Sequence, residues 1–431
     1  MFGRCRIKFS AAPLAITGPA MCLSVGVVCG LAASLLKWLI NYVSDVVRDV
    51  SGAAHGNAVV IALPIIGVMF TVVFSYYVMH SDFEYSGEKI KTLLRHGDTA
   101  ISPKLTYGTI IANALTLGFG GSAGVGGPIA NVGASLGSNI SRRMGLSDGF
   151  VRMMIWCGSA AGVAGVFTAP VGGMLFAVEC MGIQLTALSA VAILCTCIVS
   201  SLTSYVLSGC VPSLPLAGMV PQDTGYIVAV LLLGLCCGAY ALWYGGTGRA
   251  MERFLRGLPN RWVRGLVSGA AVGVLLFLFP SLYGEGYDVI ASMADAHGGM
   301  LGEYSPFALF QDDGIRSLLL AGAGVLMVKG VAAFGSISGG GVGGDFAPTL
   351  FAGAVAGFVF TGAARVFFGV ELPVQVFVVS GMAAVMAAVL RAPLMAIFLV
   401  VEMTATHAYF LPVAVAAMVS FAVVEIRDQV A

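Results

Sequence analysis

The stretch GSAGVGGPIANVGASLG at residues 121–137 consists mostly of glycine, alanine, serine and valine, with one proline at Pro128. A glycine run of this density is typical of a surface loop, but long apolar segments lie on both sides of it. A second stretch, GGGVGGDFAPTLFAGAVAG at residues 339–357, repeats the same Gly-Val-Gly-Gly core. The fold therefore needs the same bare backbone in two places.

The composition indicates that the solvent around this chain is lipid. Of 431 residues, 58% are hydrophobic and 10% are charged, whereas a water-soluble chain carries about a quarter charged residues. A helix needs about 20 apolar residues to cross a hydrocarbon core of about 30 Å. We therefore expect an all-α, multi-pass integral membrane protein, with spans in the segments 14–40, 57–79, 186–207, 226–244, 264–281 and 316–334.

The distribution of charge predicts which links face the cytoplasm, because Lys and Arg accumulate on that side. Three basic residues precede an apolar stretch that is too long for a cleavable signal peptide. The five arginines within 249–264 indicate a cytoplasmic link, and the acidic stretch 283–304 has no Lys or Arg and is placed outside. The predicted organisation is a cytoplasmic flank at 1–12, a first membrane half at 13–207, a non-cytoplasmic link at 208–224 and a second, inverted membrane half at 225–431.

Two motifs recur in the same order in both halves. The Gly-Val-Gly-Gly core at 124–127 returns at 341–344, and APVGGMLFAVE at 169–179 returns as APLMAIFLVVE at 392–402. The second half enters the membrane the opposite way up, so the repeat is inverted. Inverted repeats are a common construction of transporters, with the binding site between the halves.

Four prolines mark helices that begin inside the membrane. Proline prefers the first turn of a helix, and Pro128, Pro170, Pro348 and Pro393 each precede a short apolar run. Most of these runs are too short to span the bilayer, so we expect discontinuous half-helices. Non-helical backbone at that depth requires protein or a water-filled path beside it.

The glycines before these prolines have two interpretations. At Gly124, Gly126 and Gly127, bare backbone lets N–H groups at a helix start approach an anion, which the helix dipole also favours. At Gly133 and Gly137, the spacing of four favours close helix–helix packing instead. The first interpretation predicts that the helix starts of the two halves converge near the middle of the membrane.

These motifs together resemble the CLC family of chloride channels and chloride/proton antiporters, in a short bacterial form. GGDFAP at 343–348 is similar to the family's G-x-F-x-P motif, and GVGGP at 124–128 stands where the family has Gly-Lys/Arg-Glu-Gly-Pro. YSGEK at 85–89 stands where the family has Gly-Ser-Gly-Ile-Pro, and the repeated motifs at 169–179 and 391–404 are also family signatures. The resemblance implies an inverted-repeat helical bundle that forms a homodimer with one pore per subunit.

The resemblance also implies an anion path, which would bind chloride or another small anion. The positions it assigns to that path are Ser86, Val125, Gly126, Gly127, Asp345, Phe346 and Ala347.

Both proton-handling carboxylates of the family's antiporters are replaced in this chain. The external gate glutamate is Gly126, and the position of the internal glutamate is Cys180, directly after Glu179. The family's central-site tyrosine would fall beyond Ala431, so the resemblance identifies no counterpart for it. A proton-coupled exchanger needs a group that can hold a proton in the membrane, for which a carboxylate is suited. We therefore predict passive, proton-uncoupled anion conduction.

Asp345 leaves alternatives open, because it stands at a helix start where the family has an apolar residue. The favoured interpretation is an N-cap. The other two are a substitute gate or proton carrier, which would make the protein a coupled antiporter, and a solvated residue of the vestibule. The repeated Glu179 and Glu402 are interpreted as acceptors for backbone N–H groups rather than as proton carriers.

Other functional classes are disfavoured. The HExxH motif of zinc-dependent hydrolases is absent from the sequence, and neither an enzyme nor a metal or cofactor site is expected. The net charge of +1 is too small to attract a nucleic acid, so no nucleic-acid partner is expected. A structural or regulatory homologue that has lost transport remains an alternative. We expect a location in the bacterial inner membrane, and the sequence leaves the physiological anion open.

Overall fold

The computed structural model describes residues 14–51, 59–79, 99–209, 214, 216, 226–295, 301 and 315–430. The predicted flank at 1–12 and most of the link at 208–224 lie outside the described residues. The first half contains α1 (Leu14–Ser51), α2 (Val59–Phe74), a π-helical turn (Ser75–Met79), α4 (Lys104–Gly118), α5 (Gly126–Arg143), α6 (Asp148–Phe167), α7 (Pro170–Glu179) and α8 (Ala187–Leu207). The second half contains α9 (Ile227–Arg256), α10 (Arg261–Leu278), α11 (Tyr287–Ala294), α13 (Ile315–Ser338), α14 (Phe346–Phe368), α15 (Val374–Leu390), α16 (Pro393–Thr404) and α17 (Phe410–Val430).

Within the described residues, nine helices are long and apolar enough to cross a membrane. Each of the six predicted spans overlaps one of them, which confirms the all-helical membrane fold. The helices that begin at Pro170 and Pro393 are short, with 10 and 12 residues. The expectation of a half-helix is wrong for α14, which runs for 23 residues because it ends only at Gly369, a left-handed C-cap with φ of 66°.

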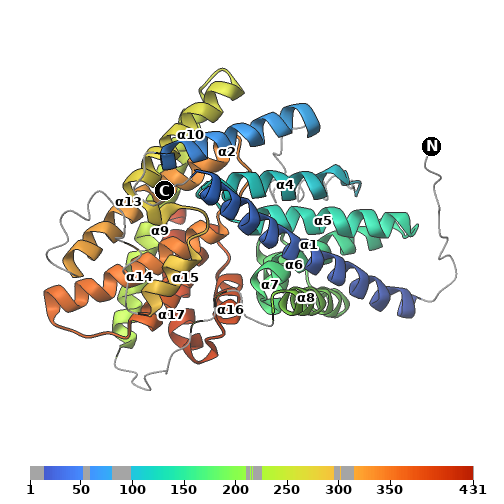
Figure 1. The fold of residues 1–431 in the computed structure, drawn as a ribbon. Helices are drawn as coiled ribbons and strands as arrows, with labels where there is room; N and C mark the ends of the chain where they lie inside the picture. Colours follow the sequence, from blue (N-terminus) through green and yellow to red (C-terminus); the bar gives the residue numbers. More distant parts are fainter. Residues whose placement is uncertain are drawn as a thin grey trace.

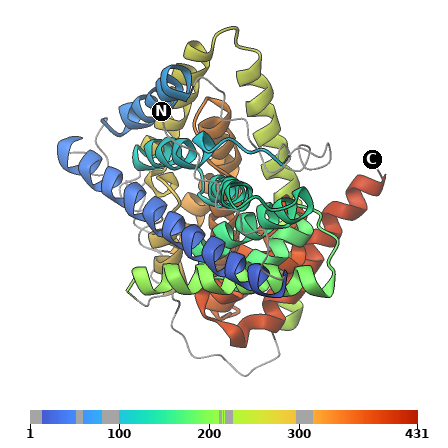
Figure 2. The same ribbon diagram turned by 90° about the vertical axis from the view of Figure 1, so that its right-hand side faces the viewer.

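The two halves lie beside each other, with α4–α8 on one side and α13, α14, α15 and α17 on the other (Figure 1). Figure 2 shows the long α1 crossing α8 at the outside of the first half, and these two helices are in contact. The short α7 and α16 pack against each other between the halves.

Each half is built around one helix pair whose backbones touch at glycines. In the first half, Gly133 of α5 lies against the carbonyl of Gly158 of α6. In the second half, Gly353 of α14 lies in the same way against Gly381 of α15. A Cβ at any of the four would fall well inside van der Waals contact with the opposing carbonyl oxygen. The packing interpretation of Gly133 is therefore confirmed, and the repeat extends to tertiary contacts.

The short helices α7 and α16 exchange caps between the halves. At the end of α7, the Glu179 carboxylate accepts the backbone N–H groups of Leu394 and Met395, at 3.1 and 2.7 Å. At the end of α16, the Glu402 carboxylate accepts those of Val171 and Gly172, at 3.1 and 2.8 Å. Since the end of each helix contacts the start of the other, the two run antiparallel, as an inverted repeat requires. The two glutamates are backbone acceptors, as the sequence indicated.

Candidate anion-binding site

The two glycine stretches meet at a single point between the halves. Gly124 and Gly344 form an isolated antiparallel bridge, in which each N–H donates to the other's carbonyl at 2.9 and 2.8 Å. The starts of α5 and α14 follow the bridge by two residues on either chain segment. The predicted convergence of these helix starts is confirmed.

Both helices begin with two N–H groups and then a proline. The first intrahelical bond of α5 runs from the Ile129 N–H to the Val125 carbonyl, so Gly126 and Gly127 come before it. In α14 the first bond runs from Thr349 to Asp345, and Phe346 and Ala347 come before it. N–H groups in this position have no acceptor within their own helix and carry the positive end of its dipole. Two pairs of donors therefore lie near the same bridge.

The bridge glycines leave room for these donors. A Cβ at Gly124 would lie 2.8 Å from the backbone nitrogen of Ala347, and one at Gly344 would lie 2.9 Å from that of Gly127. Each glycine of the bridge thus makes space for an N–H group of the opposite half. This close approach explains why the sequence needs bare backbone twice.

Neighbouring helices hold each glycine stretch in place. From α4, the Asn113 amide donates to the Val342 carbonyl at 2.8 Å, and the Thr116 hydroxyl accepts the Val342 N–H at 2.9 Å. From α13, the Ser336 hydroxyl accepts the N–H of Ser122 at 2.9 Å. Each half therefore positions the glycine stretch of the other through buried hydroxyl and amide groups.

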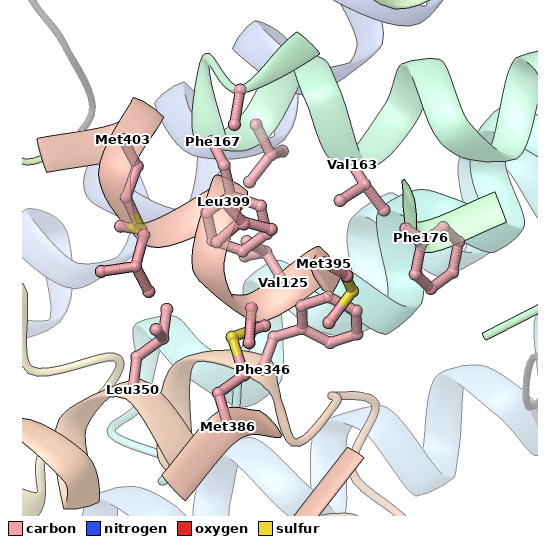
Figure 3. Close-up of a cluster of buried hydrophobic side chains, with 14 of the residues drawn as sticks. Val125, Val163, Phe167, Phe176, Phe346, Leu350, Met386, Met395, Leu399 and Met403 are labelled. Atoms are coloured by element: carbon pink, nitrogen blue, oxygen red, sulfur yellow. The ribbon is translucent and has the colours of Figure 1, made fainter. Parts of the chain in front are cut away.

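An apolar cluster surrounds the starts of α5, α14 and α16 (Figure 3). At its centre Phe346, 6% exposed, packs against Phe167 of α6 and Phe176 of α7, with ring centroids 6.0 and 5.7 Å away. A Cβ at Gly126 would lie 2.6 Å from Cγ of Phe346. The phenylalanine thus occupies the space into which a side chain at position 126 would project.

A cavity of about 530 Å³ opens on one side of the α5 start and reaches Val125. Lys37 and Arg48 of α1 line it together with Glu285, which follows the short helical turn after α10. One carboxylate oxygen of Glu285 accepts the Val125 N–H at 3.1 Å. Burial raises the pKa of Glu285, and the Val125 N–H and the ammonium groups of Lys37 and Lys329 oppose that rise.

Lys329 is a buried cation in the middle of the apolar helix α13, with 1% of its surface exposed. Its ammonium donates to the Ser122 hydroxyl at 2.9 Å and lies 4.4 Å from the ring centroid of Phe351. Ser122 is two residues before the bridge glycine Gly124. The Lys329 side chain therefore contacts the first glycine stretch directly, at Ser122.

A second cavity of about 520 Å³ reaches the other side of the same helix start, at Gly127 and Pro128. Its charged lining residues are Glu252, Arg256, Arg261, Arg264 and Asp345. The hydroxyl of Thr109, which also lines this cavity, is buried and has no hydrogen-bond partner among the described residues. Two cavities therefore approach the α5 start. The one at Val125 is lined by two basic and two acidic residues, the latter being Glu285 and Asp288, and the one at Gly127 by three arginines and two acidic residues.

Asp345 stands at the N-cap position of α14, but its side chain makes no capping hydrogen bond. The favoured N-cap interpretation is therefore wrong for the carboxylate. One carboxylate oxygen instead accepts the hydroxyl of the buried Tyr244 of α9, at 3.4 Å.

Of the two remaining candidate residues, Cys180 and Ser86, the structure describes only Cys180. Cys180 is the residue after α7, and its thiol lies 3.8 Å from the sulfur of Met395, at the edge of the apolar cluster. Ser86 lies outside the described residues. Sequence reasoning missed both Glu285 and Lys329, although a lysine inside an apolar helix is itself a signal of function.

The family model described as voltage gated chloride channel matches residues 84–425. The chain is 30% identical to a protein described as ClcB-like, a putative chloride channel protein of Ralstonia nicotianae, over 75% of this chain and 73% of that one. It is 29% identical to the H(+)/Cl(-) exchange transporter ClcA of Salmonella typhi, over 69% of this chain and 61% of that one.

Two solved structures share the fold. A slow cyanobacterial Cl-/H+ antiporter matches with a TM-score of 0.79 and 22% identity, over 97% of this chain and 96% of that one. A CLC-type fluoride/proton antiporter matches with a TM-score of 0.74 and 22% identity, over 97% and 98%. From the family match and the inverted-repeat architecture together, we conclude that this chain belongs to the voltage-gated chloride channel, or CLC, family of membrane anion transporters.

Proposed function

We propose that the protein conducts small anions passively, without coupled proton movement, through one path per subunit. Chloride is the anion we expect. The observation that carries the proposal is the pair of helix starts at the Gly124–Gly344 bridge, which direct donors from both halves toward one region. The path runs from the cavity at Val125 past the α5 start to the cavity at Gly127.

Backbone donors, and the excess of basic residues in the cavity at Gly127, support an anion as the cargo. Helix N-termini stabilise negative charge without requiring a charged side chain at the site. Gly126, Gly127, Phe346 and Ala347 supply these donors, and Val125 stands at the entrance from the first cavity. A cation pathway would favour carboxylates or carbonyl oxygens as ligands, whereas the starts of α5 and α14 present backbone N–H groups from both halves.

The absence of coupling is inferred from two positions in the sequence. Gly126 cannot carry a proton, and the Phe346 ring fills the space beside it. At position 180 the chain carries a thiol where the antiporters have a carboxylate, and this thiol lies against the thioether of Met395. Proton-coupled exchange through Asp345 is the competing proposal, favoured by its buried contact with Tyr244 and by relatives named as exchangers.

Anion efflux from liposomes tests the proposal. Liposomes loaded with chloride and containing the purified protein, with potassium and valinomycin to carry compensating charge, are expected to release chloride faster than protein-free liposomes. The same measurement with fluoride and nitrate ranks the anions. Release no faster than from protein-free liposomes, for every anion and at every pH, would instead establish a homologue that has lost transport.

A further inference from the structure

The Glu285 carboxylate occupies the position at the start of α5 that an anion from the first cavity would reach. Its oxygen lies 3.1 Å from the Val125 nitrogen, the donor nearest that cavity. A carboxylate and a small anion bind a helix N-terminus through the same interaction with N–H groups and the dipole. Only one of them can hold the Val125 N–H at a time.

The carboxylate reaches this position from a separate element, 160 residues along the chain. Glu285 lies between two glycines, Gly284 and Gly286, both with positive φ, at 62° and 77°. Neither glycine carries a side chain that would crowd the glutamate, and the segment follows a turn of only three residues. The side chain can therefore swing away from Val125 within the cavity, without any movement of the helix bundle.

The charged groups around Glu285 come from three elements. Lys37 and Arg48 line the same cavity from α1, and Tyr287 and the acidic Asp288 line it at the start of α11. Lys329 of α13 interacts electrostatically with Glu285. The cations stabilise a negative group at the α5 start, whether that group is the carboxylate or an anion that has replaced it. Protonation of Glu285 together with binding of an anion therefore leaves the net charge beside the α5 start unchanged.

We propose that Glu285 is a displaceable gate, whose carboxylate must leave the Val125 N–H before an anion can bind at the start of α5. The inference rests on the proposed conduction path, and it assigns the gate to a residue outside both glycine stretches. Protonation removes the charge that holds the carboxylate on the N–H group. The gate is accordingly closed at alkaline pH and open at acid pH.

Chloride efflux against pH tests the gate with Glu285→Gln. The glutamine keeps an oxygen that can accept the Val125 N–H, so a static cap survives the substitution and only the charge is lost. Burial raises the pKa of Glu285 to about 7, so about a tenth of these carboxyl groups are protonated at about pH 8 and nearly all at about pH 5. Wild-type efflux should therefore rise on the order of tenfold between these pH values. The variant should show the wild-type acid rate at both pH values. Asp295→Asn, which removes an exposed carboxylate at the end of α11, should keep the wild-type profile.

Four outcomes contradict the inference, and they are distinguishable. Efflux that is independent of pH in the wild type, or an acid rise that persists in Glu285→Gln, overturns the gate and leaves the conduction path intact. The same acid rise lost equally in Asp295→Asn would assign the effect to general surface charge and also overturn the gate. Absence of efflux from both proteins at every pH overturns the proposed function, and the gate with it.

Discussion

Gly158→Ala is expected to destabilise the protein strongly. The new Cβ would fall inside van der Waals contact with the carbonyl oxygen of Gly133, and both groups belong to rigid helix backbone. Overpacking typically lowers the free energy of unfolding by about 1–3 kcal/mol and occasionally more. Because the group that must move is helix backbone, we expect a loss of about 3 kcal/mol. The midpoint of thermal unfolding in detergent measures the effect.

Gly149→Ala is the matched control for this prediction. Gly149 lies in the same helix, α6, but is exposed and has no atom within 4 Å of its hypothetical Cβ. Alanine at such a helical position is expected to be neutral or to stabilise by up to about 1 kcal/mol. Equal unfolding midpoints for the two variants would contradict the backbone contact between α5 and α6.

Glu402→Ala is expected to lower the free energy of unfolding by a comparable amount, because it removes the acceptor of two N–H groups at the start of α7. A buried donor left without a partner costs about 1–3 kcal/mol, so we expect a loss of about 2–4 kcal/mol. Glu402→Gln keeps one acceptor oxygen and should fall between the alanine variant and the wild type. Unfolding midpoints of detergent-solubilised protein provide the comparison.

The repeat supplies an internal comparison for this second prediction. Glu179→Ala should lower the free energy of unfolding by less. One of the two residues that donate to Glu179 is Leu394, which is 47% exposed, so its N–H group can bond to another acceptor. Glu371→Ala serves as the control, since Glu371 is an exposed side chain 3.9 Å from Arg365, and exposed pairs contribute about 0–1 kcal/mol. A larger loss at Glu371 than at Glu402 would rule out the cap exchange as a stabilising contact.

The helical spans and the meeting of the two halves could be predicted from the sequence for a physical reason. A chain in lipid must satisfy its own backbone, so long apolar runs become helices. The proline-marked starts at Pro128 and Pro348 also indicate where regular backbone is interrupted. The length of α14 was not predictable in the same way. Gly353 and Gly357 resemble helix-breaking positions in the sequence, but both are packing sites against α15.

The side-chain partners of the site could not be predicted from local patterns. Capping preference places Asp345 at its position, but the competing contact with Tyr244 comes from a helix about 100 residues away. The contact of Glu285 with Val125 likewise depends on how two distant segments pack. Periodicity and motif spacing describe neighbours along the chain, and they carry no information on which remote group completes a helix start.

The central claim is tested most directly by measuring proton and anion movement in the same liposomes. A chloride gradient is imposed across the membrane of liposomes containing the protein, and an external pH electrode records protons while chloride release is followed. We predict chloride release with no uphill proton movement, because Gly126 and Cys180 replace both carboxylates of the antiporters' proton route, so that a proton bound by Glu285 has no second carboxylate at position 180 to pass to. Reproducible uphill proton movement driven by the chloride gradient would contradict the account, and its loss in Asp345→Asn would identify Asp345 as the proton carrier.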